Sequence, residues 1–388
     1  MKKNWQYKKL GEVCEIKSGY TPATEDLLET GEIPYFKVGD MNSEGNEKFL
    51  INTLSYLSYP CKTFPKDSIV FPKNGAAIGT NKKRILKQPS VVDLNTAILV
   101  PNKDYNIEFL YYYILNIDFK KITRRGAVPT LDIKELKSFI LPYLRLSEQE
   151  RIVAELDLLS GIMEKQKQQL KELDTLAQSI FYSMFGEENG ELKNWEITDI
   201  HNCFEYIRNG ANIKQSKNAK GLPITRIETL SRGIFNRERM GFADIFNLEG
   251  LEKHILDDND LLMSHINSKT HIGKTVLYKK LKNETIIHGM NLLRMKPSIS
   301  IINPTYIIYF FGTFFFKSQL SSIRKDAVNQ SSFSVSALNK LKVKLPPLSL
   351  QNQFAEKIEK IEKQKEAINK NIEETQKLFD FTMDKYFG

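Results

Sequence analysis

The chain has 388 residues, of which 41% are hydrophobic and 27% charged, and its net charge at neutral pH is +9. This composition excludes a wholly disordered or collagen-like chain, and the length predicts two or three domains with their own cores. The positive charge favours a polyanionic partner, although charge alone does not separate nucleic-acid binders from other basic proteins.

The sequence predicts neither a membrane-spanning helix nor an export signal. The longest apolar run, residues 306–316, is interrupted by Gly312 and Thr313, whereas a spanning helix needs about 20 apolar residues. No apolar segment follows the first lysines, so we expect no signal peptide. The three cysteines are far apart and form no CxxC, which fits a reducing compartment and excludes a disulfide framework. We therefore expect a cytoplasmic protein without a membrane partner.

An internal repeat of long period organises the chain. The separation between paired segments grows along the chain, which predicts insertions in the second copy, and then stays constant over the last two pairs. The pairs are Lys3-Asn4-Trp5 with Lys193-Asn194-Trp195, Ile16-Lys17-Ser18-Gly19 with Ile207-Arg208-Asn209-Gly210, Ile78-Gly79-Thr80 with Ile272-Gly273-Lys274, Leu146-Ser147-Glu148-Gln149 with Leu348-Ser349-Leu350-Gln351, and Phe185-Gly186 with Phe387-Gly388.

Each copy begins with a turn-rich part that predicts a mixed α+β domain. Short β-type runs at 68–71 and 97–100 lie between Pro, Gly, Asn and Asp, and helices are expected at 107–115 and 304–316. The predicted division of the chain is a first domain at 1–146, a helix at 147–186, a second domain at 187–348 and a helix at 349–388.

Each copy ends with a heptad pattern that predicts a long helix of about 55 Å. Ser147 followed by Glu150 predicts a capping box at its start, and Ser349 keeps the cap in the second copy. A seam of this kind favours packing of the two helices on each other, although two helices buried in separate cores would also satisfy it. The predicted seam residues are Ile152, Leu156, Leu159, Met163, Leu170, Leu173, Ile180, Phe354, Ile358, Ile361, Ile368, Ile372 and Phe379, with polar interruptions at Gln166, Lys365, Thr375 and Thr382.

The positive charge lies outside these helices. Residues 147–186 carry four basic and seven acidic side chains, and residues 349–388 carry seven and eight, so the two domains hold a net charge of +13. This distribution favours nucleic-acid binding by the domains.

Loops that carry Lys, Arg, Asn, Ser and His can contact both phosphates and base edges, although any single such residue can equally be a solvated loop residue. The paired placement of such loops in the two copies is what favours an interface. The predicted DNA-contact residues are Lys17, Lys37, Lys73, Asn74, Lys82, Lys83, Arg84, Arg124 and Arg125 in the first domain, and Arg208, Lys214, Arg226, Ser264, His265, Asn267, Ser268, Lys269, Lys274, Arg324 and Lys325 in the second.

Motifs for catalysis are not found. Gly273-Lys274-Thr275 matches the end of a P-loop, but Ser268 stands where the first glycine is required. No GxGxxG follows a strand, and all five histidines fall in the second copy, which argues against a duplicated metal or acid–base site. The sequence predicts a non-catalytic chain with no cofactor or metal of its own.

Two variable domains alternating with two similar long helices resemble the DNA specificity subunit of a type I restriction-modification system. The helix-entry segments Leu141–Ile152 and Leu345–Phe354 carry the resemblance, with Leu350 and Asn352 where the family usually has acids. The stretch Arg124-Arg125-Gly126-Ala127 also resembles a family feature.

The resemblance implies two target recognition domains, each reading one half of a split double-stranded DNA target, and an antiparallel helix spacer. It implies two methyltransferase subunits that use S-adenosylmethionine and a motor-nuclease subunit that uses ATP and magnesium. A coiled-coil adaptor whose duplicated domains bind proteins is the alternative, and the charge of the domains argues against it.

Overall fold

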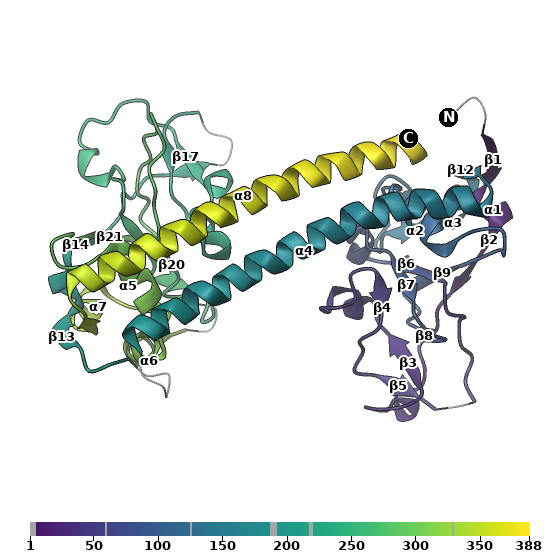
Figure 1. The fold of residues 1–388 in the computed structure, drawn as a ribbon, viewed down its shortest axis with the longest axis horizontal. Coiled ribbons are helices and arrows are strands. Elements are labelled where there is room, and N and C mark those ends of the chain that lie inside the picture. Colours follow the sequence, from purple (N-terminus) through teal and green to yellow (C-terminus); the bar gives the residue numbers. More distant parts are fainter. Residues whose placement is uncertain (1–4, 59, 125, 187–191, 217–219, 328–329) are drawn as a thin grey trace. The chain divides into compact units, whose positions relative to one another are not determined.

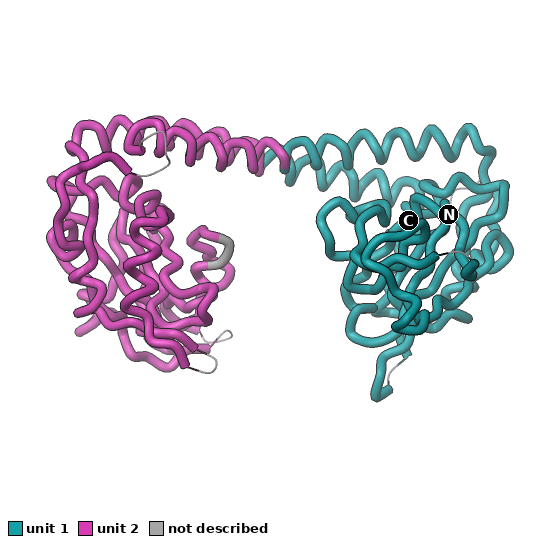
Figure 2. Tube along the Cα trace, turned by 90° about the horizontal axis from the view of Figure 1, so that it is seen from below, with its two compact units in different colours: residues 1–167, 370–388 teal, residues 168–369 magenta. Residues whose placement is uncertain are grey.

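The computed structural model describes the chain except for residues 1–4, 59, 125, 187–191, 217–219 and 328–329. The described residues form two compact units (Figure 2). Unit 1 comprises residues 1–167 and 370–388, and unit 2 comprises residues 168–369. Each unit therefore contains one globular domain and part of both long helices, whereas the predicted division set the helices apart from the domains.

Unit 1 is built on a five-stranded sheet with the strand order β2-β9-β6-β7-β4. All its strand pairs are antiparallel except β4 with β7. A separate pair, β1 with β12, closes the domain next to the long helix. The elements are β1 (Gln6–Lys9), α1 (Leu10–Val13), β2 (Cys14–Ser18), β3 (Ile33–Phe36), β4 (Phe49–Leu50), β5 (Tyr56–Leu57), β6 (Ile69–Pro72), β7 (Arg84–Leu86), β8 (Val91–Val92), β9 (Thr96–Pro101), α2 (Ile107–Leu115), β10 (Thr123–Arg124), β11 (Thr130–Leu131), α3 (Ile133–Ser138), β12 (Ile140–Tyr143) and α4 (Leu146–Phe185) (Figure 1).

Unit 2 repeats this plan with a four-stranded sheet, in the order β14-β21-β18-β20, and a closing pair of β13 with β24. The elements are β13 (Glu196–Asp199), β14 (Phe204–Asn209), β15 (Gln215–Ser216), β16 (Pro223–Ile224), β17 (Gly241–Ala243), β18 (Leu261–Ser264), β19 (Ile266–Asn267), β20 (Thr275–Leu277), β21 (Leu292–Pro297), α5 (Pro304–Phe311), α6 (Phe314–Ile323), β22 (Lys325–Asp326), β23 (Ser331–Ser332), α7 (Val335–Leu338), β24 (Lys342–Leu345) and α8 (Leu348–Phe387).

Asparagine caps fix the start of the domain helices. The Asn106 side chain accepts hydrogen bonds from the backbone at the start of α2, and Asn303 does the same for α5. The helix predicted at 107–115 is confirmed. The single helix predicted at 304–316 is wrong, because the chain turns at Gly312 and Thr313 then caps a second helix, α6.

The ends of the long helices are part of the domain cores. Phe387 at the end of α8 packs against Phe109 of α2, with ring centroids 5.3 Å apart. Phe185 at the end of α4 packs in the same way against Tyr306 of α5, at 4.8 Å. Phe109 and Tyr306 each lie three residues after the N-cap asparagine, so the repeated Phe-Gly pair marks equivalent core positions. This packing is why the helices belong to the compact units.

Within each unit the two helices run antiparallel. In unit 1 the Glu155 carboxylate lies 3.2 Å from Lys385 Nζ and accepts a hydrogen bond from Tyr386. In unit 2 the Asp174 carboxylate lies 2.8 Å from Lys365 Nζ, so this polar interruption of the predicted seam has a partner on the other helix. All thirteen predicted seam residues are buried or half-buried.

The predicted capping box is wrong, because each helix begins before its serine. The backbone N–H groups of Glu148 and Gln149 donate to the Arg145 carbonyl, and those of Leu350 and Gln351 donate to the Pro347 carbonyl. Ser147 and Ser349 therefore lie inside the first turn, where their side chains cannot cap the helix.

The glutamine of each repeated segment locks the helix to its domain. Gln149 is fully buried; its Oε1 accepts from the Asn106 N–H (2.8 Å), and its Nε2 donates to the Asp104 and Leu144 carbonyls. In unit 2 the buried Gln351 accepts from the Asn303 N–H (2.8 Å) and donates to two backbone carbonyls in the same way. Both glutamines thus tie the start of a long helix to the N-cap of a domain helix.

Replacing Gln351 by alanine is expected to lower the free energy of unfolding by roughly 2–4 kcal/mol, because three buried backbone groups lose their partner. Gln353→Ala, at an exposed position two residues further on, is the matched control and is expected to cost little. Urea unfolding followed by circular dichroism measures both. Equal stability of the two variants would contradict the role assigned to Gln351.

No helix among the described residues is both long and apolar enough to cross a membrane.

Candidate nucleic-acid interface

In unit 1 the segment after the central strand β6 lies beside the hairpin β10–β11. The Leu131 N–H donates to the Lys73 carbonyl (2.9 Å), and the Gly75 N–H donates to the Pro129 carbonyl (2.8 Å). Asn74 forms a β-bridge to the same hairpin. The predicted Lys73-Asn74-Gly75 loop and the hairpin that carries Arg124 are therefore one continuous polar element.

Unit 2 builds the same element from different residues. The segment after β18 forms the short strand β19, which pairs with β23 of the hairpin β22–β23. The Phe333 N–H donates to the His265 carbonyl (3.2 Å), as Leu131 does to Lys73 in unit 1. Since the backbone contacts match while the side chains differ, the two copies offer two different polar surfaces at equivalent places.

Two neighbours hold the polar side chains of the unit 1 loop. Lys73 Nζ donates to the Ser18 hydroxyl (2.7 Å), and Asn74 Nδ2 lies 3.4 Å from Asn95 Oδ1. Partial burial lowers the pKa of Lys73 below its usual range. Ser18 and Asn95 therefore belong to this surface, and the sequence motifs did not single out either as a DNA contact.

Carboxylates position the arginines of the hairpins. Arg124 is largely exposed and its Nε lies 2.6 Å from Asp132. Arg324 is mostly buried, 2.8 Å from Asp326, which also lies 3.8 Å from the exposed Lys269. Lys325 is exposed in strand β22, and Ser268 is exposed directly after strand β19 of the same sheet. Arg125 lies outside the described residues.

A second group of cations in unit 1 surrounds the 3₁₀ helix η2 (Val38–Asn42). Lys82 donates to the Asn42 side chain, and Arg84 donates to the Met41 carbonyl (2.8 Å). Both side chains are half-buried and serve the fold at least in part. Lys17, Lys37 and Lys214 are exposed; Lys17 pairs with Glu15 at 2.8 Å, and Lys37 is the N-cap residue of η2.

Lys83 does not fit the prediction. Its side chain is fully buried, and Nζ donates to the Ile117 carbonyl (2.8 Å) and to Asn81 (2.7 Å) above the Phe119 ring. Burial lowers the pKa of Lys83 to about 7. A lysine held inside the domain in this way cannot reach a phosphate, and the run Lys82-Lys83-Arg84 gave no sign of which member points inward.

Ser264 and His265 are also buried, with exposed fractions of 1% and 7%. The Ser264 hydroxyl accepts a hydrogen bond from Asn267 (3.1 Å), so it orients a neighbour rather than offering a contact itself. His265 packs against Phe333, and burial lowers its pKa, which keeps the ring neutral. Among these residues Asn267 remains the candidate for a base contact.

Arg208 and Arg226 are half-buried in unit 2. The Arg208 guanidinium stacks on Tyr206 at 3.9 Å and donates to the Lys253 carbonyl (2.5 Å). Arg226 lies 3.8 Å from Glu228. The stacking and the short hydrogen bond hold the Arg208 guanidinium in place, whereas the longer pair of Arg226 with Glu228 is a weak contact.

Three predicted contacts line a hollow of about 580 Å³ in unit 2 together with residues that the sequence analysis missed. The polar residues that were not predicted are Glu228, His271 and those of the run Asn236–Arg239, whose high charge density could have indicated it. The lining residues are Ile227, Glu228, Leu230, Asn236, Glu238, Arg239, Ser264, Asn267, His271 and Lys274.

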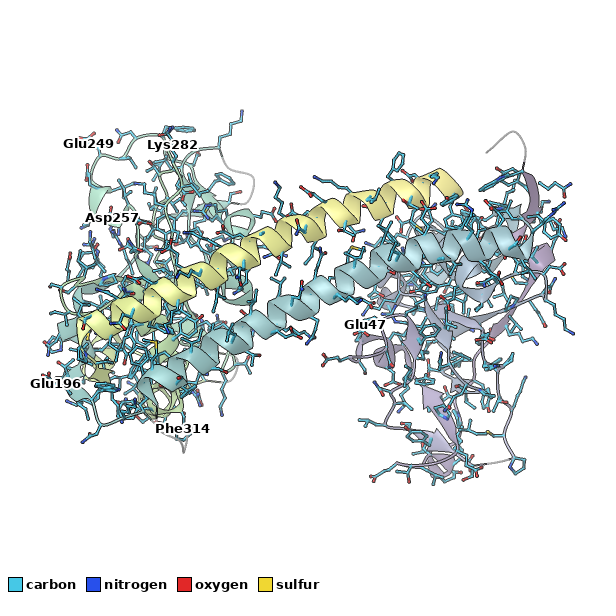
Figure 3. The ribbon with its side chains drawn as sticks, viewed as in Figure 1. Glu47, Glu196, Glu249, Asp257, Lys282 and Phe314 are labelled. Carbon is cyan, nitrogen blue, oxygen red and sulfur yellow. The ribbon has the colours of Figure 1, made fainter. Side chains whose placement is uncertain are left out.

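The most deeply buried charges of unit 2 are not part of this surface. Arg294 is 1% exposed and its Nε lies 2.7 Å from the buried Asp260, with Asp257 (labelled in Figure 3) at 2.9 Å. Burial raises the pKa of Asp260 to about 6. Removing one partner of this network would leave an uncompensated charge in the domain interior. Among the described residues no group of His, Cys, Asp and Glu forms a candidate metal site.

Comparisons with known proteins agree on one family. The model for the type I restriction modification DNA specificity domain matches residues 2–173 and 192–376, once per copy of the repeat. The putative type I restriction enzyme MjaX specificity subunit of Methanocaldococcus jannaschii is 39% identical over 215 residues, which are 54% of this chain and half of that relative. The type I restriction enzyme EcoKI specificity subunit of Escherichia coli K12 is 22% identical over 392 residues, covering 95% of this chain and 84% of that relative.

A solved structure has the same fold. It is the type I restriction-modification S subunit from M. genitalium, with a TM-score of 0.55 and 13% identity, covering 99% of this chain and 96% of that one. The duplicated domains, the two long helices and the duplicated family match together place this chain in the type I restriction-modification DNA specificity family, whose members are non-catalytic specificity subunits.

Proposed function

We propose that each globular domain reads one half of a bipartite duplex DNA target. The element formed by the segment after β6 or β18 and the neighbouring hairpin is the reading surface. The observation that carries the proposal is the equivalence of the two elements: the backbone contacts repeat, while Lys73 and Asn74 in one are replaced by His265 and Ile266 in the other. Different side chains on equivalent scaffolds suit two different half-sites.

The chain acts in this proposal as the recognition subunit of a larger complex. Two methyltransferase subunits bring S-adenosylmethionine, and motor-nuclease subunits bring ATP and magnesium. The support comes from the family match and from the relatives, which are named as specificity subunits of type I restriction enzymes. The long helices are the spacer between the half-sites and a docking surface for the partners.

Arg124→Glu is expected to weaken DNA binding without changing the preferred sequence, because the exposed guanidinium suits a phosphate contact. The dependence of log K on log salt should lose about one unit of slope, since each phosphate contact contributes about 0.9. Lys83→Met is the control: this lysine is buried inside the domain and cannot reach a phosphate, so the slope should stay the same. Filter-binding titrations of the assembled complex measure the salt slope of each variant. Equal slopes for wild type and Arg124→Glu would show that Arg124 does not contact a phosphate.

Asn267→Ala is expected to relax specificity in one half-site only, by about 1–3 kcal/mol per discriminated base pair, if its amide makes a bidentate base contact. Asn74→Ala should do the same at the other half-site. Competition with duplexes altered at single positions measures the effect. A change at both half-sites caused by Asn267→Ala would contradict the assignment of one domain to one half-site.

A further inference from the structure

The two units differ at one edge of the main sheet. In unit 1 strand β4 pairs in parallel with β7, and the Ile85 N–H donates to the Lys48 carbonyl (2.9 Å). In unit 2 the strand equivalent to β7 is β20. Strand β7 is the next strand after β6 in its sheet and pairs antiparallel with it, and β20 pairs in the same way with β18. The sheet of unit 2 ends at β20, and no described segment pairs with its outer edge.

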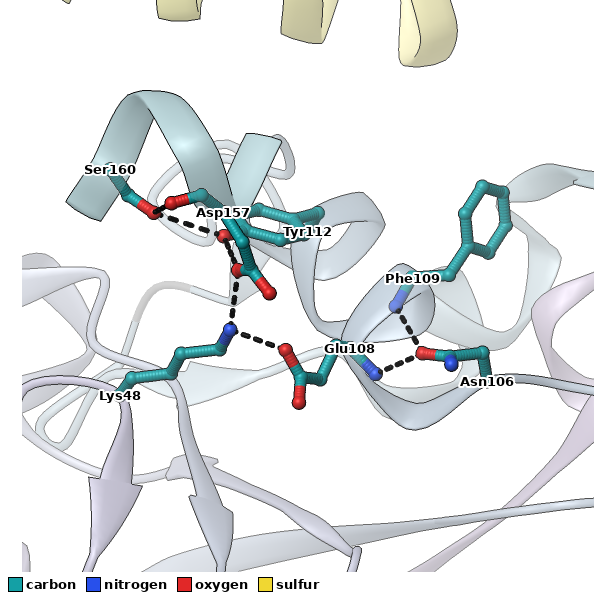
Figure 4. A network of polar contacts seen from close by, with 7 residues as sticks. All are labelled: Lys48, Asn106, Glu108, Phe109, Tyr112, Asp157 and Ser160. Atoms are coloured by element: carbon teal, nitrogen blue, oxygen red, sulfur yellow. Dashed lines mark hydrogen bonds and ion pairs between the residues drawn. The ribbon is translucent and has the colours of Figure 1, made fainter. Parts of the chain in front are cut away.

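Strand β4 brings a lysine to the long helix in unit 1. Lys48 Nζ lies 2.5 Å from Glu108 of α2 and 2.6 Å from Asp157 of α4 (Figure 4). Tyr112 of α2 donates a hydrogen bond to the same Asp157. Burial opposes ionisation of Asp157, yet the hydrogen bonds from Lys48 and Tyr112 hold its pKa below the usual range. The lysine therefore joins the sheet edge, the domain helix and the long helix.

In unit 2 a cavity of about 1030 Å³ occupies the corresponding place. Thr275, Val276 and Leu277 of β20 line it, so the free sheet edge faces the cavity. Tyr309 and Glu359 line it as well. Counted from the helix starts, Tyr309 stands where Tyr112 stands in α2, and Glu359 where Asp157 stands in α4. The cavity thus has equivalents of Tyr112 and Asp157, but strand β4 and its Lys48 have no described equivalent there.

The charges and the rim of the cavity suit a polypeptide occupant. Glu356, Glu359, Glu362 and Glu366 lie along its α8 wall, and Ile234 and Ile299 at its edge are 59% and 72% exposed. Three lysines also line the cavity: Lys279 donates to the Asn259 side chain, Lys365 pairs with Asp174, and Lys363 lies on the surface of α8. Lys363 pairs with Glu359 at 2.7 Å while 70% exposed, and such an exposed pair is weak and can be exchanged.

We propose that this cavity binds an extended segment of a partner protein in which a lysine or arginine precedes two large apolar residues. The segment adds to β20 as a parallel strand, as β4 adds to β7, and its backbone pairs with the free edge of the sheet. The apolar side chains cover the exposed isoleucines of the rim, and the cation meets Glu359 and Tyr309. The glutamates of the wall disfavour DNA as an occupant. This inference is independent of the proposed DNA-reading role.

The test uses the complete chain and a probe taken from its own first copy. A labelled, end-blocked peptide with the sequence of residues 45–52 contains Lys48 and strand β4. Saturable binding with one peptide per chain is expected in fluorescence anisotropy at low salt, together with slower hydrogen exchange of the Leu277 amide. A Lys48→Glu change in the peptide should weaken binding about tenfold, because an attraction becomes a repulsion.

Protein variants locate the site. Glu359→Lys should weaken peptide binding about tenfold, whereas Glu373→Lys, an exposed position on α8 outside the cavity, makes the same change in net charge and should have no effect. Both glutamates are exposed, so neither variant should disturb the fold. The proposal is overturned if the peptide does not bind at millimolar concentration, if the two variants behave alike, or if Asp157→Asn and not Glu359→Lys weakens binding. The last result would mean that the peptide replaces β4 in unit 1.

Discussion

A chain with seven residues inserted into each long helix, after Leu170 and after Ile372, is expected to recognise the same two half-sites further apart. Seven helical residues add about 10 Å at 1.5 Å per residue. At about 3.4 Å per base pair this corresponds to close to 3 additional base pairs in the spacer. A whole heptad keeps the apolar seam in phase, so Leu170 and Ile372 stay half-buried between the helices. Methylation mapped across genomic DNA with the assembled complex measures the spacing.

The control for this experiment is an insertion of five residues at the same two positions. Five residues do not complete the heptad, so the seam beyond the insertion is rotated away from its partner and the complex should lose activity. The last two repeat pairs have the same separation, so the two helices have the same length. Two helices that pack against each other along their whole length are expected to have equal lengths. An active heptad variant with the original spacing would mean that the helices do not set the distance.

Gly210→Ala is expected to unfold much of unit 2. A Cβ atom at Gly210 would lie 2.3 Å from the carbonyl oxygens of both His288 and Gly289, and backbone atoms on a neighbouring segment cannot move aside cheaply. We expect a loss of about 3–5 kcal/mol in the free energy of unfolding, at the upper end of the effects of single substitutions. Gly19 in unit 1 has the same surroundings, with the carbonyl oxygens of Asp93 and Val92 at 2.2 and 2.4 Å.

Gly161→Ala is the matched control, because no atom lies within 4 Å of its Cβ position and the residue is inside α4. Alanine there should stabilise the helix by up to about 1 kcal/mol. Thermal unfolding followed by calorimetry compares the variants. A Gly210→Ala protein as stable as wild type would show that the close backbone approach is not required.

The repeat could be predicted from the sequence because its anchors are positions where packing allows few residue types. Gly19 and Gly210 avoid a clash, Phe185 and Phe387 fill the two cores, and the heptads follow from helical periodicity. The role of Gln149 was missed, although its segment was recognised as repeated. A buried glutamine that bonds to a distant N-cap leaves no local pattern, since two of its three partners are 43 and 45 residues away.

The candidate site was less accessible to prediction, because composition does not tell which side of a loop faces solvent. Lys83 and Lys82 are neighbours in one basic run, yet only Lys83 is fully buried, because its Nζ donates to the Ile117 carbonyl and to Asn81 above the Phe119 ring. His265 and Asn267 are only two residues apart, yet His265 is buried and Asn267 is half-buried. No described segment of unit 2 pairs with β20 as β4 pairs with β7, and the repeat has no anchor between Gly19 and Ile78 that could have indicated this difference.

Selection of bound sequences from a randomised duplex library by the assembled complex tests the central claim most directly. Two blocks of specified bases, separated by a fixed number of unspecified ones, are predicted, and Asn267→Ala should alter one block while the other stays unchanged. A single contiguous block, or no enrichment of any sequence at moderate salt, would contradict the proposal that the two domains of this chain read two half-sites of DNA.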